Sequence, residues 1–380
     1  MIAVNNGIFD YGTKTLLPFT PENVFLTKST IDYNPNASNI NIHNNDDSTD
    51  WDIESWMTDL SDDPEIVELL WQVVGAIIRP YVSWDKVACF YAESGSNGKG
   101  TLCELMRNLC GKKNHASIPF SAFEKQFMLQ QLPFISAIIT DENDVKGFNT
   151  VGASLKAVIT GDGVQINIKY KTPITYHFKG LMVQCVNDLP RFTDKSESLY
   201  RRFLMIPFDK CFTGSERKYI KSDYLARQEV LEYVLHKVLH MDYYELSEPD
   251  ACISLLDTSK SFNDPVRQFI EEVLNELVWS LIPNQFLYDL YRAWFRKNSP
   301  SGRCQSKSTF LKDVKNLLGS HLEWVVTDSS VPTRNHMDKP EMLIMEYSLT
   351  DWMNPYYKGN DVNKICTPVT KKSYSGLLRN

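Results

Sequence analysis

A glycine-rich loop between an apolar run and an amphipathic run constrains the fold of this chain more than any other feature. Residues 86–92 (KVACFYA) predict a short buried strand, and residues 100–111 (GTLCELMRNLCG) predict a helix that ends at Gly111. Between them, residues 95–100 (GSNGKG) are close to the G-x-x-x-x-G-K-[ST] pattern of phosphate-binding loops. Strand, glycine-rich loop and helix in this order favour a nucleotide-binding loop over an ordinary turn.

The residues of this loop are the candidate ligands for ATP: Gly95, Ser96, Asn97, Gly98, Lys99, Gly100 and Thr101. Their backbone N–H groups and the dipole of the following helix would cradle the β- and γ-phosphates, and the Lys99 ammonium would bind the same oxygens. Two positions depart from the pattern. Glu93 replaces the first glycine, and Gly100 replaces the hydroxyl residue that usually ligates Mg²⁺. Thr101 is the nearest substitute as a metal ligand, or it contacts the α-phosphate instead.

The composition is that of a globular chain. Its 380 residues, 43% of them hydrophobic, are enough for two or three domains with ordinary cores. There is no apolar run of about 18 residues, so we expect no transmembrane helix, and the N-terminus lacks the features of a signal peptide. The eight cysteines include no C-x-x-C pair. This favours reduced thiols in a cytoplasmic protein over a disulfide framework or a zinc site.

The charge is distributed unevenly along the chain. Residues 1–80 contain 3 Lys or Arg and 13 Asp or Glu, whereas the remaining residues contain 37 and 34. An acidic segment repels the phosphate backbone of nucleic acids, so we expect any contact with DNA to lie after residue 80. The acidic segment itself is either a solvated surface or a docking site for a protein partner.

Three further apolar runs follow the loop. They are residues 132–144 (LPFISAIITDEND), 179–192 (KGLMVQCVNDLPRF) and 201–208 (RRFLMIPF). Four buried strands with helical segments between them indicate an α/β sheet. Ligands of such sheets bind at the carboxyl ends of the strands, where the polar residues that follow these runs lie.

The polar residues that end two of these runs are candidate catalytic groups. Asp141 and Glu142 follow one strand, where one carboxylate can hold Mg²⁺ and the next can polarise the attacking water. Asn187 follows another, and its amide can orient that water or sense the γ-phosphate. Taken alone, the carboxylates also fit a solvated strand end, and Asn187 also fits a turn.

Basic residues stand at two other places. Arg201 and Arg202 precede the last strand, where an arginine can complete the ATP site of a neighbouring subunit or form a surface salt bridge. Residues 167–178 (NIKYKTPITYHF) alternate apolar and polar side chains as a hairpin strand does. Lys169 and Lys171 on this hairpin can follow a nucleic-acid backbone, or they keep an edge strand soluble.

The C-terminal third is predicted to form a small domain of its own. Residues 264–277, 283–298 and 306–318 predict amphipathic helices, and residues 322–328 and 341–347 are strand-like. Three helices and a hairpin are the layout of a winged-helix domain. The sequence thus divides into an acidic N-terminal domain (1–80), a core (81–212), a helical connection (213–260), a winged-helix-like domain (261–360) and a basic tail (361–380).

The order of these motifs resembles that of the superfamily 3 helicases, in particular the primase-helicases of phages, plasmids and mobile genetic elements. The resemblance rests on GSNGKGT, IITDE, LKAVITGDGVQINIKYK, VQCVND and SLYRRFLMIPF, and on the N-terminal NNGIFDYGTKTLLPFTPE. It implies an α/β fold: an AAA+ P-loop ATPase core with a small N-terminal α+β domain and a C-terminal winged-helix domain. It also implies a homo-hexameric ring with ATP and Mg²⁺ between subunits and DNA in the central channel.

The same resemblance implies a role for each motif. It places phosphate binding at Lys99, Mg²⁺ and water at Asp141 and Glu142, the sensor at Asn187, the arginine finger at Arg202, and DNA binding at Lys169 and Lys171. Arg202 is preferred to Arg201 because the family has its finger directly before the aromatic residue that opens the last strand. Lys156 is a further candidate for contacting the phosphates of a neighbouring subunit.

The resulting hypothesis is an ATP-dependent DNA helicase that acts on single-stranded or forked DNA in the replication of a phage or mobile element, in the cytoplasm of a bacterial host. The acidic segment would dock a primase, polymerase or loader. Residues 1–80 are too few and too acidic for a primase, so we expect no primase activity from this chain.

Two alternatives belong to other functional classes. One is an AAA+ ATPase that loads or remodels a partner protein. The other is an origin-binding module, in which Lys307, Lys312 and Lys315 of the last predicted helix contact DNA phosphates. That helix has no row of Arg or Asn suited to reading bases, which speaks against sequence-specific binding.

Overall fold

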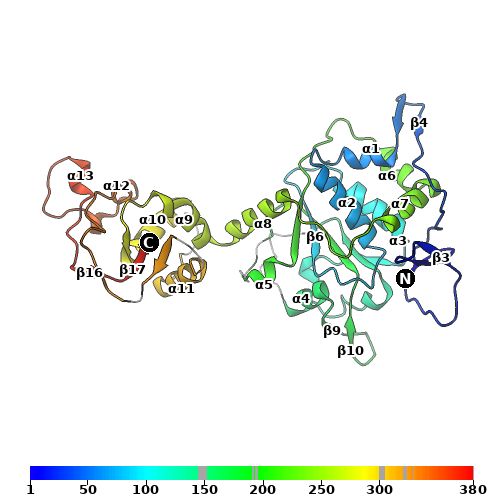
Figure 1. Ribbon diagram of the computed structural model, residues 1–380, viewed down its shortest axis with the longest axis horizontal. Coiled ribbons are helices and arrows are strands. Elements are labelled where there is room, and N and C mark those ends of the chain that lie inside the picture. The colour runs from blue at the N-terminus through cyan, green and yellow to red at the C-terminus, as the bar shows by residue number, and fades with distance from the viewer. Residues whose placement is uncertain are drawn as a thin grey trace. The chain divides into compact units, whose positions relative to one another are not determined.

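The computed structural model describes residues 1–143, 152–190, 192, 196–298, 304–319, 323–327 and 329–379. The chain forms two compact units, Met1–Asn263 and Asp264–Asn380, which Figure 1 colours from blue to red along the chain. No helix among the described residues is long and apolar enough to cross a membrane.

The first unit is built around a parallel sheet of five strands. In sheet order these are β12 (Phe203–Pro207), β6 (Val87–Tyr91), β11 (Leu181–Val186), β8 (Ala137–Thr140) and β7 (His115–Ala116). All neighbouring pairs are parallel, so the carboxyl ends of the strands share one edge of the sheet. The four longer strands coincide with the four predicted apolar runs, which confirms the predicted α/β sheet.

Helical layers cover both faces of the sheet because its strands are apolar on both sides. The helices of one layer are α2 (Pro64–Ala76), α3 (Lys99–Cys110) and α7 (Gln228–His240). Ala88 and Phe90 of β6 pack into a core with these helices. The alternate residues Val87 and Cys89 pack into a second core, together with α4 (Ala153–Thr160) and buried residues between 116 and 135.

Further helical elements complete the unit. They are η1 (Phe120–Ala122) and η2 (Leu132–Phe134), α5 (Glu197–Tyr200), α6 (Lys218–Ser222), η3 (Tyr224–Ala226) and α8 (Asp250–Asn263). An antiparallel hairpin of β9 (Gly163–Ile166) and β10 (Ile174–His177) projects from the body of the unit in Figure 1.

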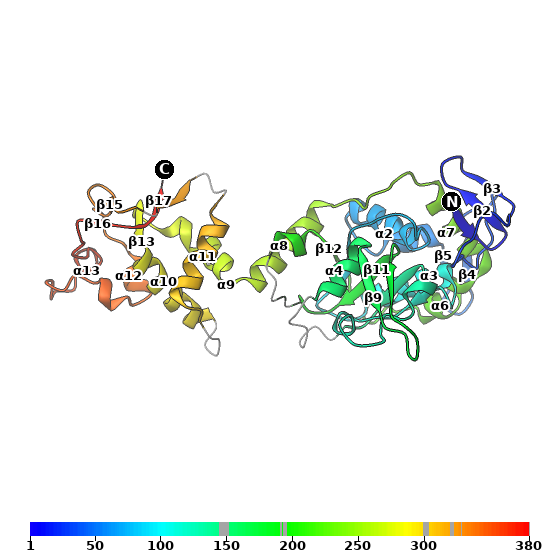
Figure 2. The same cartoon turned by 90° about the horizontal axis from the view of Figure 1, so that it is seen from below.

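The acidic N-terminal residues pack onto this body. They form an antiparallel sheet of β1 (Ile2–Val4), β2 (Gly7–Asp10) and β3 (Thr15–Leu17), a hairpin of β4 (Ile42–Asn44) and β5 (Thr49–Trp51), and helix α1 (Ile53–Thr58). Phe9, Trp51 and Met57 are buried in the same core as α2, α3 and α7. Figure 2 shows β2 and β3 beside α7 at one end of the unit.

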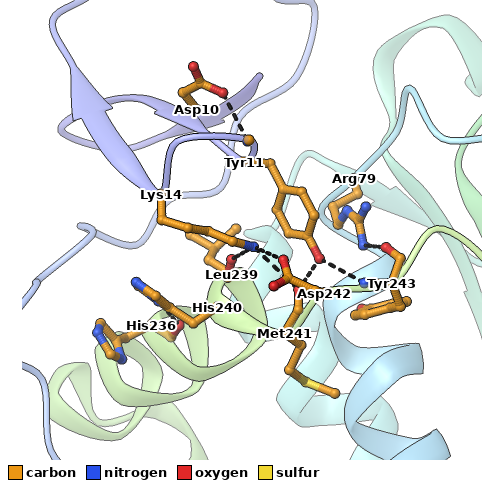
Figure 3. Close-up of polar contacts among 11 residues, drawn as sticks. Asp10, Tyr11, Lys14, Arg79, His236, Leu239, His240, Met241, Asp242 and Tyr243 are labelled. Carbon is orange, nitrogen blue, oxygen red and sulfur yellow. Dashed lines mark hydrogen bonds and ion pairs between the residues drawn. The ribbon is translucent and has the colours of Figure 1, made fainter.

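Aromatic and charged residues fasten the N-terminal strands to the end of α7 (Figure 3). Lys14 Nζ lies 2.7 Å from the Asp242 carboxylate. Arg79 is 3% exposed and donates a hydrogen bond to the Tyr243 carbonyl at 2.8 Å. Its guanidinium lies 3.9 Å from the centre of the Tyr11 ring. The buried guanidinium of Arg79 among aromatic rings stabilises the contact between the N-terminal strands and the end of α7. The N-terminal strands are therefore an integral part of the first unit.

A histidine pair at the same end of α7 predicts that the stability of the fold depends on pH. The His236 and His240 ring centres lie 4.2 Å apart, and the Tyr33 ring lies 6.0 Å from His236. Burial, and then the charge of His240, lower the pKa of His236. The unfolded chain therefore binds protons more readily than the folded chain once the pH falls to about 6.5 and below.

We expect the free energy of unfolding to decrease as the pH is lowered from about 7.5 to about 5.5. Urea denaturation followed by tryptophan fluorescence measures this change. A His236→Gln variant should show a smaller decrease than the wild type. Some decrease should remain in the variant, because burial also lowers the pKa of His115. An equal decrease in both proteins would contradict the role of His236.

The second unit combines helices with a three-stranded antiparallel sheet. Its helices are α9 (Pro265–Val273), η4 (Leu274–Glu276), α10 (Asn284–Asn298), α11 (Lys307–Leu317), α12 (Leu343–Glu346), η5 (Thr350–Trp352) and α13 (Val362–Ile365). The sheet order is β13 (Leu281–Pro283), β17 (Gly376–Arg379) and β14 (Trp324–Val326), and β15 (Val331–Pro332) pairs with β16 (Ser373–Tyr374). The three predicted amphipathic helices are present as α9, α10 and α11.

The strand predicted over residues 341–347 is wrong. Helix α12 occupies this segment, and β14 pairs with β17 from the C-terminal tail instead. A short apolar run fits a helix as well as a strand, and here the tertiary contacts decide. The buried Glu341 carboxylate accepts the backbone N–H groups of Val278 at 2.8 Å and Trp279 at 3.2 Å. Residues 322 and 328, the ends of the other predicted strand, lie outside the described residues.

Candidate nucleotide-binding site

The glycine-rich loop connects β6 to α3, as predicted. Lys99 is the first residue of α3, and the Gly98 carbonyl accepts the N–H groups of Thr101 at 3.0 Å and Leu102 at 2.9 Å. Gly98 has a φ angle of +86°, and a Cβ atom there would lie 2.6 Å from the Leu60 side chain. This turn therefore requires glycine. Because α3 begins directly after it, the positive end of the helix dipole faces the loop.

The structure brings together two residues that were predicted from separate motifs, Lys99 and Asn187. The Lys99 ammonium donates to Asn187 Oδ1 at 2.8 Å, and it lies 3.4 Å from the carbonyl oxygens of Ala92 and Val186. The side chain is 6% exposed, and burial lowers the pKa of its ammonium group. The cation is thus held at the carboxyl ends of β6 and β11, where an anion would relieve its desolvation.

The acidic strand end lies at the same edge of the sheet. Asp141 directly follows β8, and its carboxylate accepts a hydrogen bond from Arg107 of α3 at 2.9 Å. Glu142 beside it is exposed. Arg107 is a residue that the sequence did not single out. It also lies 3.3 Å from Glu104, and such an i,i+3 pair is the pattern of an ordinary helix surface.

Asn143 is a second residue that sequence reasoning missed. Its amide nitrogen donates to Gln184 Oε1 and to the Cys185 carbonyl, each at 3.0 Å, and its Oδ1 accepts the Phe120 N–H at 3.0 Å. Asn143 therefore ties the segment that follows β8 to β11. The sequence did contain a signal for Asn143, because it is the third polar residue in a row after the apolar run.

Oxygen atoms that suit Mg²⁺ are present at this edge. They belong to the carboxylates of Asp141 and Glu142 and to the hydroxyl of Thr101, in the first turn of α3. Among the described residues, no group of three or more His, Cys, Asp or Glu side chains could hold a metal by itself. Mg²⁺ usually binds one or two carboxylates together with substrate phosphates and water. These residues therefore fit a Mg²⁺ ion that binds with a nucleotide.

Arg202 lies at the amino ends of the strands, whereas Lys99 lies at their carboxyl ends. Its carbonyl accepts the N–H of Val87, the first residue of β6, at 2.8 Å, whereas the loop follows the last residue of β6. Its guanidinium donates to Ser198 Oγ at 3.0 Å. A strand of five residues separates these edges by about 16 Å, so Arg202 cannot reach the Lys99 site of its own chain. The neighbouring Arg201 is exposed.

Lys169 and Lys171 lie at the tip of the β9–β10 hairpin. The last strand pair is Ile166 with Ile174, so the strand predicted from residue 167 is wrong up to residue 173, and both lysines lie in the turn. Tyr170 between them has a φ angle of +62° and is 93% exposed. The Lys169 ammonium lies 5.2 Å from the centre of this ring. Both lysines are exposed, which places two cations and an aromatic ring at one projecting tip.

These features fit a P-loop-like core on a mixed α/β fold. Residues 90–202 match a family model described only as a family of unknown function (DUF5906). Residues 261–354 match a second model, described as poxvirus D5 protein-like. This second match covers most of the second unit, and it supports the resemblance to the superfamily 3 primase-helicases.

Several solved structures are similar to the chain. Two are structures of the apo NrS-1 C-terminal region. One is 15% identical, covers 86% of this chain and 74% of that chain, and has a TM-score of 0.45. The other is 13% identical, covers 93% and 81%, and has a TM-score of 0.46. A JCV helicase with a bound small molecule is 16% identical, covers 63% and 62%, and has a TM-score of 0.33.

Proposed function

We propose that this chain is an ATP-dependent DNA helicase of superfamily 3 that acts in the replication of a phage or mobile genetic element. The observation that carries the proposal is the contact between Lys99 and Asn187 at the carboxyl edge of the sheet. The loop strand β6 and the acidic strand β8 are both neighbours of β11, which carries Asn187 at its end. An AAA+ core arranges its loop, sensor and acidic strands in this order.

The described contacts support a role for each residue in ATP hydrolysis. Lys99 and the backbone of the loop would hold the β- and γ-phosphates, and Asn187 would exchange its bond to Lys99 for one to the γ-phosphate or the attacking water. Asp141 and Thr101 would hold the Mg²⁺ that neutralises phosphate charge. Glu142, exposed beside them, is free to polarise the water.

The position of Arg202 supports assembly into a ring. Because Arg202 lies at the far edge of the sheet, it would act on the ATP of a neighbouring subunit, as an arginine finger supplied in trans. Each active site would then need two chains. A closed homo-hexamer satisfies this requirement for every subunit, since each subunit gives one arginine and receives another.

The hairpin tip supports contact with single-stranded DNA. Lysine ammonium groups bind phosphates, and an exposed tyrosine is a platform on which a base can stack. Six copies of Lys169, Tyr170 and Lys171 in a ring would concentrate positive charge in the channel, although the chain has a net charge of -7. Hydrolysis at the subunit interfaces would move these tips along one strand.

The second unit supports an accessory role in binding. Its order of α9, β13, α10, α11, β14 and β17, with an antiparallel sheet, would suit a winged helix with a long insertion before the last strand. Lys312 and Lys315 on α11 would contact DNA phosphates, and Lys307 at the start of the same helix donates to Gln285 at 2.6 Å. The acidic N-terminal segment would dock a primase, polymerase or loader.

Strand displacement on a forked DNA with ATP and Mg²⁺ tests the proposal. We expect Lys171→Ala to reduce unwinding about tenfold or more while DNA-independent ATP hydrolysis stays unchanged, because the tip is remote from the nucleotide residues. Lys112→Ala, at another exposed lysine, is the matched control and should unwind normally.

Two outcomes would contradict parts of this proposal. Wild-type unwinding that survives Lys171→Ala would remove the hairpin from the mechanism. A wild-type ring that hydrolyses ATP but displaces no strand would favour an ATPase that loads or remodels a partner.

A further inference from the structure

A cavity of about 430 Å³ adjoins the glycine-rich loop on the side of the N-terminal segment. Three stretches of the first unit line it: residues 51–60, residues 96–101 of the loop and start of α3, and residues 212–221. Gly98 and Thr101 belong to both the loop and the cavity wall. The cavity is thus continuous with the place where the phosphates would bind, and its volume lies within the usual range for small-molecule pockets, about 300–1,000 Å³.

One wall of the cavity is aromatic and aliphatic. It is formed by Trp51 at the end of β5, Trp56 of α1, Leu60 and Phe212. Trp51 and Trp56 are 5% and 9% exposed, so each offers only a small part of its surface to the cavity. A heterocyclic base is flat and weakly hydrated on its faces, and aromatic walls are the surfaces on which bases stack.

Contacts around the cavity hold this wall against the loop. The Phe212 N–H donates to the Ser96 carbonyl at 2.7 Å, and the Ser96 hydroxyl donates to Glu216 at 3.1 Å. Leu60 packs directly against Gly98, and the Trp51 ring lies 5.3 Å from the Tyr224 ring. The wall and the loop therefore form one preorganised surface, without a large rearrangement before binding.

A cation lies where this cavity meets the start of α3. The Lys221 ammonium of α6 is 3.6 Å from the position that a Cβ atom on Gly100 would occupy. The side chain is exposed and lines the cavity. From that position Lys221 would face the phosphate nearest the sugar, whereas Lys99 is buried at the strand ends beside Asn187. The two lysines would thus bind different parts of one triphosphate.

From this geometry we infer that the cavity binds the nucleoside half of the triphosphate. The base lies against Trp56 and Phe212, and Lys221 binds the phosphate next to the sugar. The inference rests on the proposed nucleotide-binding function and adds the residues that recognise the base. It also gives residues 51–60 of the acidic N-terminal segment a part in the ATP site, beyond the docking of partners.

Comparison of two ligands separates base recognition from phosphate recognition. The affinities of ATP and of inorganic tripolyphosphate are measured by calorimetry with Mg²⁺, on the full chain. Trp56→Ala and Phe212→Ala should weaken ATP binding about tenfold and leave tripolyphosphate binding unchanged, because only the base contact is lost. Lys221→Gln should weaken both ligands severalfold. Tyr81→Ala, at an exposed aromatic residue of the same unit, is the matched control.

Folding and the failure of either proposal can be told apart. Circular dichroism and thermal unfolding identify a variant that fails to fold, and the milder Trp56→Leu, which keeps apolar volume but no aromatic ring, then replaces Trp56→Ala in the binding comparison. Lys99→Ala should weaken both ligands strongly. If it does so while the cavity variants bind ATP like the wild type, the base pocket is wrong and the phosphate site stands. If Lys99→Ala changes neither affinity, the proposed nucleotide site itself fails, and the base pocket fails with it.

Discussion

Lys99→Ala is expected to lower ATP hydrolysis by about a hundredfold or more. The Lys99 ammonium is held at the carboxyl edge of the sheet by Asn187 Oδ1 at 2.8 Å and by two strand-end carbonyls. It is therefore positioned before the nucleotide binds, and little reorganisation is needed when charge develops on the transferring phosphoryl group. Steady-state phosphate release by the assembled protein measures the effect.

A second substitution distinguishes a loss of chemistry from a loss of structure. Asn187→Ala should also reduce hydrolysis, by a smaller factor, because the lysine keeps its other two contacts. Both variants should unfold at temperatures near that of the wild type, since Asn187 is exposed and the loss of Lys99 also removes the desolvation cost of its buried ammonium group. Lys112→Ala is the exposed-lysine control. Normal turnover by a folded Lys99→Ala variant would refute the assignment of the loop.

Arg202→Ala is expected to lower ATP hydrolysis by about a hundredfold or more, although it leaves the nucleotide-binding residues of its own chain intact. The loss is expected because Arg202 would stabilise charge on the phosphoryl group of a neighbouring chain. The five residues of β12 place Arg202 about 16 Å from the carboxyl edge where Lys99 lies, so the nucleotide-binding residues of its own chain are not affected. ATP binding itself should change little. The phosphate-release assay measures turnover, and calorimetry measures binding.

Mixing two inactive variants tests whether Arg202 acts in trans. In an equal mixture of Lys99→Ala and Arg202→Ala chains that exchange subunits, about a quarter of the interfaces pair an intact loop with an intact arginine. We therefore expect about a quarter of wild-type hydrolysis from the mixture. Arg201→Ala, at the exposed neighbour of Arg202, is the matched control and should be active alone. A mixture that hydrolyses no faster than its components would mean that Arg202 is not shared between subunits.

Much of the first unit could be predicted because its strands are buried on both faces. Such strands need continuous apolar runs, which are easy to recognise in the sequence. The polar residues that follow these runs indicate the carboxyl ends of the strands, where ligands bind. β7 was not predicted, because two residues leave no pattern. In the second unit, α12 was mistaken for a strand, since a four-residue apolar run does not distinguish the two.

The parts of the candidate site that were missed come from side chains that meet only after folding. Arg107 resembles an ordinary helix-surface residue until α3 brings it against Asp141. Trp51, Trp56 and Lys221 lie far from the loop in the sequence, and no local pattern connects them with Gly98 or Gly100. Their positions in the cavity depend on how α1 and α6 pack beside α3.

The sequence by itself determined the strand–loop–helix unit, the polar residues that end the strands and the order in which the motifs follow. These are local properties, because burial pattern and turn chemistry act over a few residues. Only the tertiary structure decided that Lys99 meets Asn187, that Arg202 faces away from its own site and that an acidic segment lines the cavity. These depend on strand order, on strand direction and on the packing of segments more than a hundred residues apart, which a linear pattern does not encode.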